Sequence, residues 1–579
     1  MNDSAYSLLA ALQPSPTPAL IYLETGRDPI TLSRAEFSQK VETIAAAFHH
    51  LGLRSGDLII IAHTQNLESI FAFWGAITMG AIPSMFPTLT EKLDPTIYQR
   101  QLAELVALSE VKAIVTTAEF AAALRPVVGC PVWGSGQLAV KSEQSTVNSE
   151  QLAVSREQSS VSSLQSPISQ SLSLSVSPSS IAFLQHSSGT TGLQKGVALS
   201  HQAVLNQLDS LRQAIGLNER DVVVSWLPLY HDMGLIAGFI LPLVMGVPLV
   251  LMSPFDWAQH PALLFRAIHE YQGTLCWLPN FAYNHCARRI RQRDVDGLDL
   301  SSMRLFINCS EPVRHESHQM FLERFAAQGV RPEMLAVSYA MAENTFAVTQ
   351  TEPGAAATPD TIDRHELTQN RAIPVPADHP QALPLVSCGR AIRGTEVKVM
   401  GGERGRDLPE RQVGEIAIRS DCMLTEYYHR PDLQPFQDGW YYTGDMGYLA
   451  DGELYVVGRQ KDLIINAGKN IYPQDIEAII NTVPGVYPGR AVAFGVPDER
   501  EGTELLAVIA EVTTDDPDER KRINKTIRQE VARQSQVTVS YVYLVGERWL
   551  IKTSSGKIAR SANRDKWLAQ AFSRITSTD

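Results

Sequence analysis

Residues 186–196 read His-Ser-Ser-Gly-Thr-Thr-Gly-Leu-Gln-Lys-Gly and follow an apolar run at 181–184 that is typical of a buried strand. Glycines in such a turn let backbone N–H groups approach an anion, hydroxyls donate to phosphate oxygens, and a lysine adds positive charge. The combination predicts a phosphate-binding loop after a strand. The residues expected to contact phosphate are Ser187, Ser188, Gly189, Thr190, Thr191, Gly192 and Lys195.

This loop differs from that of P-loop NTPases, which requires Gly-Lys followed by Ser or Thr, because Lys195 stands between Gln194 and Gly196. Taken alone, the stretch is also compatible with a flexible Ser/Gly turn. Upstream, residues 35–51 have helical apolar spacing, and residues 58–62 form a short apolar strand. Repeated alternation of helix and strand predicts an α/β fold.

Downstream, strand-like pieces recur, and Asp451-Gly452 between two apolar runs predicts a tight hairpin. Helical and strand-like segments then alternate to the end of the chain. We expect a large N-terminal domain of layered sheets and helices over residues 1–460 and a small α+β domain over residues 461–579. The downstream strands are predicted at 222–224, 303–307, 415–418, 491–494, 505–512 and 541–545, and the late helices at 473–480 and 519–534.

The composition argues against two classes of partner. The chain has 579 residues and a net charge of -12, so it has no long-range attraction to nucleic acids or anionic lipid. The uncharged run at 235–252 is broken by Pro242, Gly246 and Pro248, which predicts a helix, a turn and a buried strand rather than an integral membrane segment.

Six cysteines lie far apart without a Cys-x-x-Cys pair, which favours reduced thiols over a zinc site or disulfides. The N-terminus shows no export signal, so a cytoplasmic location is expected. Residues 135–180 are rich in Ser and Gln, and Gln-Leu-Ala-Val at 137–140 returns at 151–154. This segment is predicted to be a disordered insertion, because it has few large apolar residues to bury.

Further motifs follow the phosphate loop in a fixed order. Together with that loop they resemble the adenylate-forming enzymes, which include acyl-CoA synthetases, peptide-synthetase adenylation domains, luciferases and fatty acyl-AMP ligases. The resemblance covers nearly the whole chain apart from the Ser/Gln insertion, and it implies that family's fold with a mobile C-terminal domain. The motifs are Trp-Leu-Pro-Leu-Tyr-His-Asp-Met-Gly-Leu at 226–235, Ser-Tyr-Ala-Met-Ala-Glu-Asn-Thr at 338–345, Tyr-Thr-Gly-Asp at 442–445, Gly-Arg-Gln-Lys-Asp at 458–462 and Thr-Ser-Ser-Gly-Lys at 553–557.

The resemblance implies that a carboxylate attacks the α-phosphate of ATP, a reaction that needs charge neutralisation and positioning. It implies ATP and Mg²⁺ as cofactors and gives each candidate residue a role. Thr190 and Lys195 would hold the phosphates, and Thr190 and Glu343 would hold the Mg²⁺. Asp445 would bind the ribose, with Arg459 beside it, and Tyr339 would stack on the adenine. Ser310 and Glu311 would line the nucleotide pocket.

The resemblance also implies three residues that act during the reaction cycle. His231 would lie at the mouth between the acyl and nucleotide pockets, although a His beside an Asp is also an ordinary structural pair. Lys557 would reach the α-phosphate during adenylation. Lys461 would be the hinge at which the small domain rotates and withdraws Lys557 after the first half-reaction.

Some of these sequence motifs resemble those of the fatty acyl-AMP ligase branch, whose members transfer the acyl group to the phosphopantetheine thiol of an acyl carrier protein. The substrate expected is therefore a fatty acid, and the carrier protein is expected to act in trans. A fatty acyl-CoA synthetase and a non-catalytic acyl-nucleotide-binding protein are the alternatives. The motifs typical of this branch lie at 230–235, 279–283, 311–313, 386–390 and 472–477, and a branch-type insertion lies at 351–384. Four residues depart from the family pattern, namely Gln194, Asn308, Cys309 and Ala340.

Overall fold

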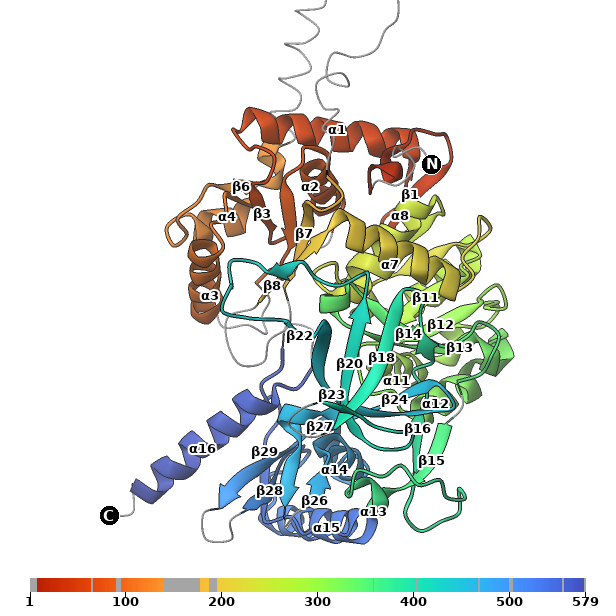
Figure 1. Ribbon diagram of the computed structural model, residues 1–579, viewed down its shortest axis with the longest axis vertical. Coiled ribbons are helices and arrows are strands. Elements are labelled where there is room, and N and C mark those ends of the chain that lie inside the picture. Colours follow the sequence, from red (N-terminus) through yellow and green to blue (C-terminus); the bar gives the residue numbers. More distant parts are fainter. Residues whose placement is uncertain are drawn as a thin grey trace, which may run out of the picture.

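The computed structural model describes residues 8–63, 66–89, 95–138, 177–186, 195–357, 359–401, 405–466, 469–498, 503–553 and 557–576 (Figure 1). Three large sheets with their helices form the N-terminal part, and a smaller unit below them in Figure 1 has hydrophobic cores of its own. The expected α/β fold with a large N-terminal and a small C-terminal domain is confirmed. The boundary between residues 460 and 461 stays a prediction.

One sheet has seven strands in the order β21-β8-β7-β4-β3-β5-β6, and β7, β4, β3, β5 and β6 run parallel. Antiparallel β7 and β8 flank the predicted phosphate-binding loop, of which residues 187–194 lie outside the described residues. The strand expected at 181–184 is confirmed as β7. The bounds are β3 (Leu58–Ile61), β4 (Ile82–Met85), β5 (Ala113–Thr116), β6 (Val132–Gly134), β7 (Ile181–His186), β8 (Gly196–Ser200) and β21 (Glu426–Tyr427).

Helices flank this sheet on both sides. The helix expected at 35–51 is α1 (Arg34–His50), and it begins with a reciprocal cap in which Ser33 Oγ accepts from Glu36 N and the Glu36 carboxylate accepts from Ser33 N. The other helices of this region are α2 (Leu67–Thr78), α3 (Pro95–Leu108), α4 (Ala118–Leu124), α7 (His201–Ala214) and a 3₁₀ turn at Leu8–Leu12.

A second sheet has nine strands in the order β17-β14-β13-β12-β11-β9-β10-β1-β2. From β13 to β1 neighbouring strands are parallel, so their carboxyl ends share one edge, which is where α/β sheets bind ligands. The bounds are β1 (Pro18–Leu23), β2 (Ile30–Ser33), β9 (Val223–Ser225), β10 (Leu249–Met252), β11 (Leu275–Leu278), β12 (Leu305–Asn308), β13 (Leu335–Ala340), β14 (Ala347–Gln350) and β17 (Arg390–Ala391).

The apolar run at 235–252 folds as expected into helix, turn and buried strand. A π-helix at Met233–Ile240 continues into α8 (Leu241–Met245), and β10 follows after Gly246, which has a left-handed φ of 83°. Within the described part of the chain, no helix is both long and apolar enough to cross a membrane. Other helices here are α9 (Pro254–Gln259), α10 (Ala262–Tyr271), α11 (Asn280–Arg289) and α12 (His315–Phe325), with 3₁₀ turns at Gln292–Asp294, Ala326–Gln328, Pro332–Met334 and Ala342–Asn344.

A third, antiparallel sheet leads to the C-terminal domain. The hairpin expected at Asp451-Gly452 is confirmed, since φ is positive at both residues, 52° and 75°. The predicted insertion at 351–384 contains β15 and the first part of β16, which form a separate two-stranded sheet, and its assignment as a branch-type insertion stays a prediction. The bounds are β15 (Pro359–Asp363), α13 (Arg364–Leu367), β16 (Ala382–Val386), β18 (Thr395–Gly401), β19 (Arg406–Asp407), β20 (Gly414–Ser420), β22 (Phe436–Gln437), β23 (Trp440–Ala450) and β24 (Glu453–Arg459).

The C-terminal domain contains a three-stranded sheet in the order β27-β28-β29. One face of this sheet packs against α14 and α15, and the other packs against the segment around Lys557 and against α16. The expected helices at 473–480 and 519–534 are α14 and α15. The bounds are β25 (Ile464–Asn466), β26 (Lys469–Ile471), α14 (Pro473–Ile480), β27 (Val486–Asp498), β28 (Thr503–Val512), α15 (Pro517–Ser535), β29 (Tyr541–Val545) and α16 (Arg560–Thr576), after a 3₁₀ turn at Gln460–Asp462.

The limits predicted for the Ser/Gln insertion are too wide. At its start, Leu138 is buried, and Gln137 Oε1 accepts from the Gly134 N–H at 3.2 Å. At its end, Ser180 N–H donates to the carbonyl oxygen of Ser177 in a turn before β7. Residues 139–176 lie outside the described residues, so their predicted disorder stays a prediction.

Candidate active site

Three candidate residues lie at or just after the carboxyl ends of parallel strands in the nine-stranded sheet. His231 comes after β9, Ser310 after β12, and Tyr339 lies near the end of β13. Glu343 follows in the 3₁₀ turn after β13. The fold therefore brings residues more than a hundred positions apart to one edge, because the carboxyl ends of parallel strands meet there.

Lys557 reaches this edge from the C-terminal domain. Its Nζ donates to the carbonyl oxygen of Ser310 at 2.6 Å. The lysine is fixed locally, since Thr553 N–H donates to the Lys557 carbonyl at 2.7 Å and Lys557 N–H donates to Thr553 Oγ1 at 3.2 Å. Ser310 has a φ of +69°, a left-handed conformation that is uncommon for serine and is frequent at functional sites.

His231 and Asp232 form a close pair beside Lys557. His231 Nδ1 lies 2.5 Å from Asp232 Oδ1, and the same oxygen accepts from the Met233 N–H at 2.8 Å. Burial alone would raise the pKa of Asp232, but His231, the Met233 N–H and Lys557 outweigh it and hold that pKa below its usual value. Asp232 is therefore an anion that orients the imidazole, which leaves His231 Nε2 for other partners.

Tyr339, Asp445 and Arg459 form a second cluster. Tyr339 O–H donates to Asp445 Oδ2 at 2.7 Å, and Arg459 Nε lies 3.1 Å from Asp445 Oδ1. Asp445 and Arg459 are direct neighbours across β23 and β24, so the hairpin itself sets their pairing. Asp445 raises the pKa of Arg459 and burial opposes it. The predicted ribose and adenine roles would require Asp445 to share its oxygens with these partners.

Glu343 lies in a cluster with two tyrosines. Tyr427 O–H donates to Glu343 Oε1 at 3.0 Å and lies 3.1 Å from the hydroxyl of Tyr441. Lys195 Nζ lies over the Tyr427 ring, 4.8 Å from its centre. The described end of the phosphate loop therefore lies close to the carboxylate that is predicted to hold Mg²⁺.

The structure does not test the predicted nucleotide contacts of Glu311 and of the phosphate loop. Glu311 Oε2 accepts from the Phe281 N–H at 2.9 Å, so this carboxylate caps the first turn of α11. Ser187, Ser188, Gly189, Thr190, Thr191 and Gly192 lie outside the described residues. Their roles, and the pocket role of Glu311, stay predictions. Among the residues that the structure describes, no group of three or more His, Cys, Asp or Glu side chains is arranged to hold a metal ion.

Lys461 lies in the 3₁₀ turn that follows β24, between the two domains. Burial and the neighbouring Arg459 lower its pKa. Arg560 fixes the far side of this turn, with ion pairs of 2.6 Å to Asp462 and 2.8 Å to Glu477. This position suits the predicted hinge, which stays a prediction.

A second contact joins the domains near Ser310. Arg314 Nη2 donates to the carbonyl oxygen of Gln474 at 2.9 Å, and Arg314 Nη1 lies 3.6 Å from Asp475 Oδ1. Burial raises the pKa of Asp475, and Arg314 partly opposes this. The pair therefore ties α14 to the edge where Lys557 is bound.

The sequence did not predict Tyr427, Tyr441 or Arg314 as site residues. Tyr427 and Tyr441 are isolated aromatics in β21 and β23, and nothing in their local spacing separates them from core residues. Arg314 directly follows the branch-type motif at 311–313, and this position next to a motif was the sequence signal that could have pointed to it.

Comparisons with known proteins identify the family to which the chain belongs. Residues 9–428 match the family model described as AMP-binding enzyme. The medium-chain-fatty-acid–[acyl-carrier-protein] ligase JamA of Moorena producens is 32% identical, with 95% of this chain and 92% of that protein covered. The long-chain-fatty-acid–AMP ligase FadD26 of Mycobacterium bovis is 31% identical, with 97% and 96% covered.

Solved structures of fatty acyl-adenylate ligases are also similar. A structure from a study of the Escherichia coli and Legionella pneumophila enzymes is 27% identical, with a TM-score of 0.83 and 98% of each chain covered. A structure of the L. pneumophila enzyme with acyl adenylate and pyrophosphate has a TM-score of 0.71, 27% identity and 98% of each chain covered.

The chain belongs to the AMP-binding enzyme family, an ATP-using, adenylate-forming class. Within that class the fatty acyl-AMP ligase branch expected from the sequence is confirmed, so the protein is an adenylate-forming ligase.

Proposed function

We propose that this enzyme activates a fatty acid to acyl-AMP with release of pyrophosphate and then transfers the acyl group to the phosphopantetheine thiol of an acyl carrier protein. The observation that carries the proposal is the contact of Lys557 Nζ with the Ser310 carbonyl, beside Asp232 and His231. A flexible cation held at this edge supplies positive charge where an adenylation reaction develops negative charge.

In the first half-reaction, a carboxylate oxygen of the fatty acid attacks the α-phosphorus of ATP. A new P–O bond forms, the bond from the α-phosphorus to the bridging oxygen breaks, and pyrophosphate leaves with its electron pair. Lys557 would exchange the Ser310 carbonyl for the α-phosphate and substrate carboxylate, and Lys195 would contact the phosphates. Asp445 would accept from the ribose hydroxyls, and Tyr339 would face the adenine.

Mg²⁺ fits the residues present, because it is commonly bound by one or two carboxylates together with substrate phosphates. Glu343 would supply that carboxylate, with Thr190 from the phosphate loop. One Glu343 oxygen accepts from Tyr427, which fixes the orientation of the carboxylate. When bound, the ion would neutralise phosphate charge during the displacement.

In the second half-reaction, the thiolate sulfur of the carrier attacks the acyl carbonyl carbon. A C–S bond forms, the C–O bond to AMP breaks, and AMP leaves. Lys557 would withdraw from the Ser310 carbonyl before this step, and rotation at the proposed hinge residue Lys461 would move it. His231, oriented by Asp232, would remain at the mouth of the acyl pocket.

The insertion at 351–384 contacts the C-terminal domain directly. Asn470 of β26 donates from its backbone N–H to the Thr368 carbonyl at 3.2 Å, and from its side chain to Asn370 Oδ1 at 2.9 Å. Rotation of the domain would break these bonds whichever thiol accepts the acyl group. The choice of a carrier protein over free CoA is supported instead by the similarity to JamA, which is named as an acyl-carrier-protein ligase. A fatty acyl-CoA synthetase is the alternative function.

The test is mass spectrometry of the products formed from ATP, Mg²⁺ and a panel of fatty acids, with either free CoA or carrier protein bearing phosphopantetheine. The proposal expects acyl-AMP that persists with CoA and an acylated carrier protein. Efficient acyl-CoA formation without carrier acylation would identify an acyl-CoA synthetase. Absence of ATP–pyrophosphate exchange would exclude both enzymes.

A further inference from the structure

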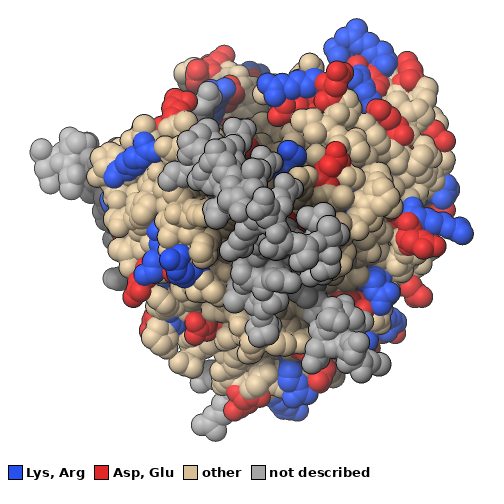
Figure 2. Space-filling model, turned by 90° about the horizontal axis from the view of Figure 1, so that it is seen from above, with Lys and Arg blue, Asp and Glu red and all other residues tan. Residues whose placement is uncertain are grey.

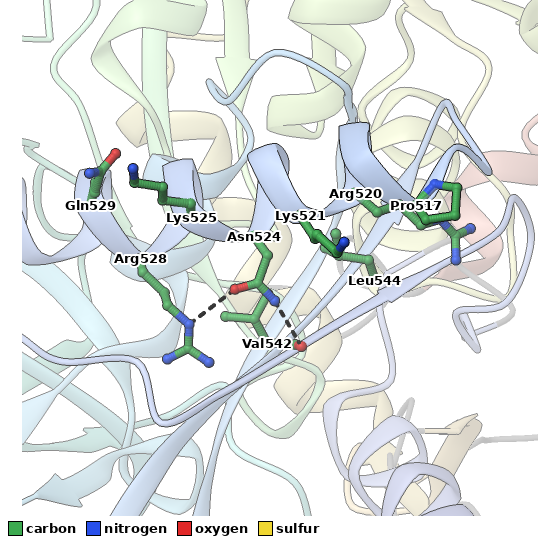
Figure 3. Close-up of a pocket in the computed structure, with 9 residues that line it drawn as sticks. All are labelled: Pro517, Arg520, Lys521, Asn524, Lys525, Arg528, Gln529, Val542 and Leu544. Carbon is green, nitrogen blue, oxygen red and sulfur yellow. Dashed lines mark hydrogen bonds between the residues drawn. The ribbon is translucent and has the colours of Figure 1, made fainter.

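A groove of about 490 Å³ lies between α15 and β29 of the C-terminal domain (Figure 3). Four cationic side chains line it, Arg520, Lys521, Lys525 and Arg528, and its apolar floor includes Val542 and Leu544. Among the described residues, no carboxylate lines the groove. It lies outside the candidate active site, and nothing in the proposed chemistry uses it.

The cations form one stripe along the helix. Residues 521, 525 and 528 follow the i, i+4, i+7 spacing of a single helix face, and a helix from 517 to 528 is roughly 16 Å long. This local charge contrasts with the chain as a whole, whose net charge is -12. On the face shown in Figure 2, by comparison, acidic and basic side chains are interspersed. The stripe therefore suits an acidic partner.

Carboxylates compensate part of this charge, since Arg520 Nη2 lies 2.6 Å from Asp515 Oδ1, and the other three cations are less well paired. Lys525 is exposed and has no ion pair with any described residue. Arg528 donates to Asn524 Oδ1 at 3.0 Å and to backbone carbonyls, rather than to a carboxylate. Lys521 lies 3.3 Å from Asp518, but both side chains are at least 80% exposed, so this pair is weak.

The floor of the groove gives it apolar area as well as charge. β29 is the edge strand of its sheet, and Val542 and Leu544 are half-buried beneath the cations. Asn524 donates to the Val542 carbonyl at 3.5 Å, which ties the helix to the strand beside the opening (Figure 3). A partner helix with acidic rows on both sides of an apolar stripe would match this surface.

The position of the groove relates it to the second half-reaction. α15 covers the sheet face opposite to the one that packs against Ile558 and α16. Lys557 therefore projects from one side of the domain and the groove opens on the other. A rotation of the domain that withdraws Lys557 would also move the groove, and a partner docked in it, relative to the acyl site.

We infer that the α15–β29 groove is the docking surface for the acyl carrier protein, through an acidic helix of the carrier. This inference rests on the proposed function, because it names where the proposed acceptor binds. A carrier protein is a small helical domain that delivers its thiol on a long flexible arm. Docking on the rotating domain would therefore leave the arm free to enter the acyl site.

The test compares two double variants with the same charge change on the same helix. The first variant, Lys521→Glu with Lys525→Glu, reverses the charge of two cations that line the groove. The control variant, Arg522→Glu with Arg533→Glu, reverses the charge of two exposed cations that do not line it. We expect the groove variant alone to raise the KM for carrier protein about tenfold and to lose most of its salt dependence. ATP–pyrophosphate exchange, melting temperature and acyl transfer to free pantetheine should match the wild type.

The outcomes separate the inference from the function on which it rests. An unchanged carrier KM in the groove variant, or an equal rise in both variants, overturns the docking surface and leaves the proposed function intact. A rise in the KM for CoA instead of carrier protein assigns the groove to the CoA nucleotide and overturns the inference. Wild-type enzyme that acylates no carrier protein overturns both. If the charge reversals lower the melting temperature, Lys521→Ala with Lys525→Ala gives the same comparison with a smaller expected KM change.

Discussion

Lys557 Nζ and the carbonyl oxygen of Ser310 are 2.6 Å apart, although 247 positions separate the two residues in the chain. This bond joins the C-terminal domain to the carboxyl edge of the nine-stranded sheet. The structure therefore holds the candidate catalytic lysine beside Ser310, which is the position that the proposed first half-reaction would use.

Lys557→Ala should reduce acyl-AMP formation by at least about 100-fold, because the cation acts where phosphate charge develops. Thioester formation from supplied acyl-AMP should stay near the wild-type rate. ATP–pyrophosphate exchange measures the first half-reaction, and carrier acylation measures the second. Equal loss in both would mean that Lys557 has a structural role.

Asp445→Ala should raise the KM for ATP and lower turnover, since a charge-assisted acceptor for the ribose is worth about 1.5–3 kcal/mol. Tyr339→Phe is the matched control, because it removes the hydroxyl that bonds to Asp445 and keeps the aromatic ring. Its effect on the KM should be smaller. If Asp445→Ala leaves the KM for ATP and the turnover unchanged, the ribose role of Asp445 is excluded.

Arg314→Ala should slow adenylation roughly tenfold and spare transfer from supplied acyl-AMP. The substitution removes the donor to the Gln474 carbonyl and leaves Asp475 buried without this partner. The adenylation orientation of the small domain should then be less populated. Arg314→Lys should recover part of the rate. A parallel loss in both half-reactions, with a lower melting temperature, would contradict this positioning role.

Acid should destabilise the protein between about pH 6.5 and pH 4. Burial lowers the pKa of His186, His201 and His318 to about 4 each, from 6.5 when unfolded. The unfolded chain therefore binds more protons in this range, so the stability present above pH 6.5 is lost as pH falls, by about 3 kcal/mol for each histidine. His201→Gln should flatten the dependence of melting temperature on pH; an unchanged slope would refute the assignment.

Shortening the insertion between residues 364 and 381 should raise CoA-dependent turnover, because it removes the Thr368 and Asn370 partners of Asn470. Adenylation should change little. Asn370→Ala removes one bond without shortening the chain and should give the same effect on a smaller scale. Stopped acyl-AMP formation would show instead that the insertion is needed for folding, since Leu367 and Ala372 are core residues.

The sequence by itself determined the α/β class, the order of the motifs and most element positions. These are local properties: the hairpin at Asp451-Gly452 and the helix α14 follow from turn chemistry and apolar spacing over a few residues. The same local reasoning placed the limits of the Ser/Gln insertion too wide, because composition does not show that Leu138 finds a buried site.

Only the tertiary structure decided which distant side chains meet. Asn308 was visible in the sequence merely as a departure from the family pattern, whereas the fold shows its amide buried between Asn280 and His318, at 3.2 Å and 2.9 Å. The partners of Glu343, Arg314 and Lys557 were equally undetermined. Such contacts depend on how strands and domains pack, and no short-range spacing rule encodes that packing.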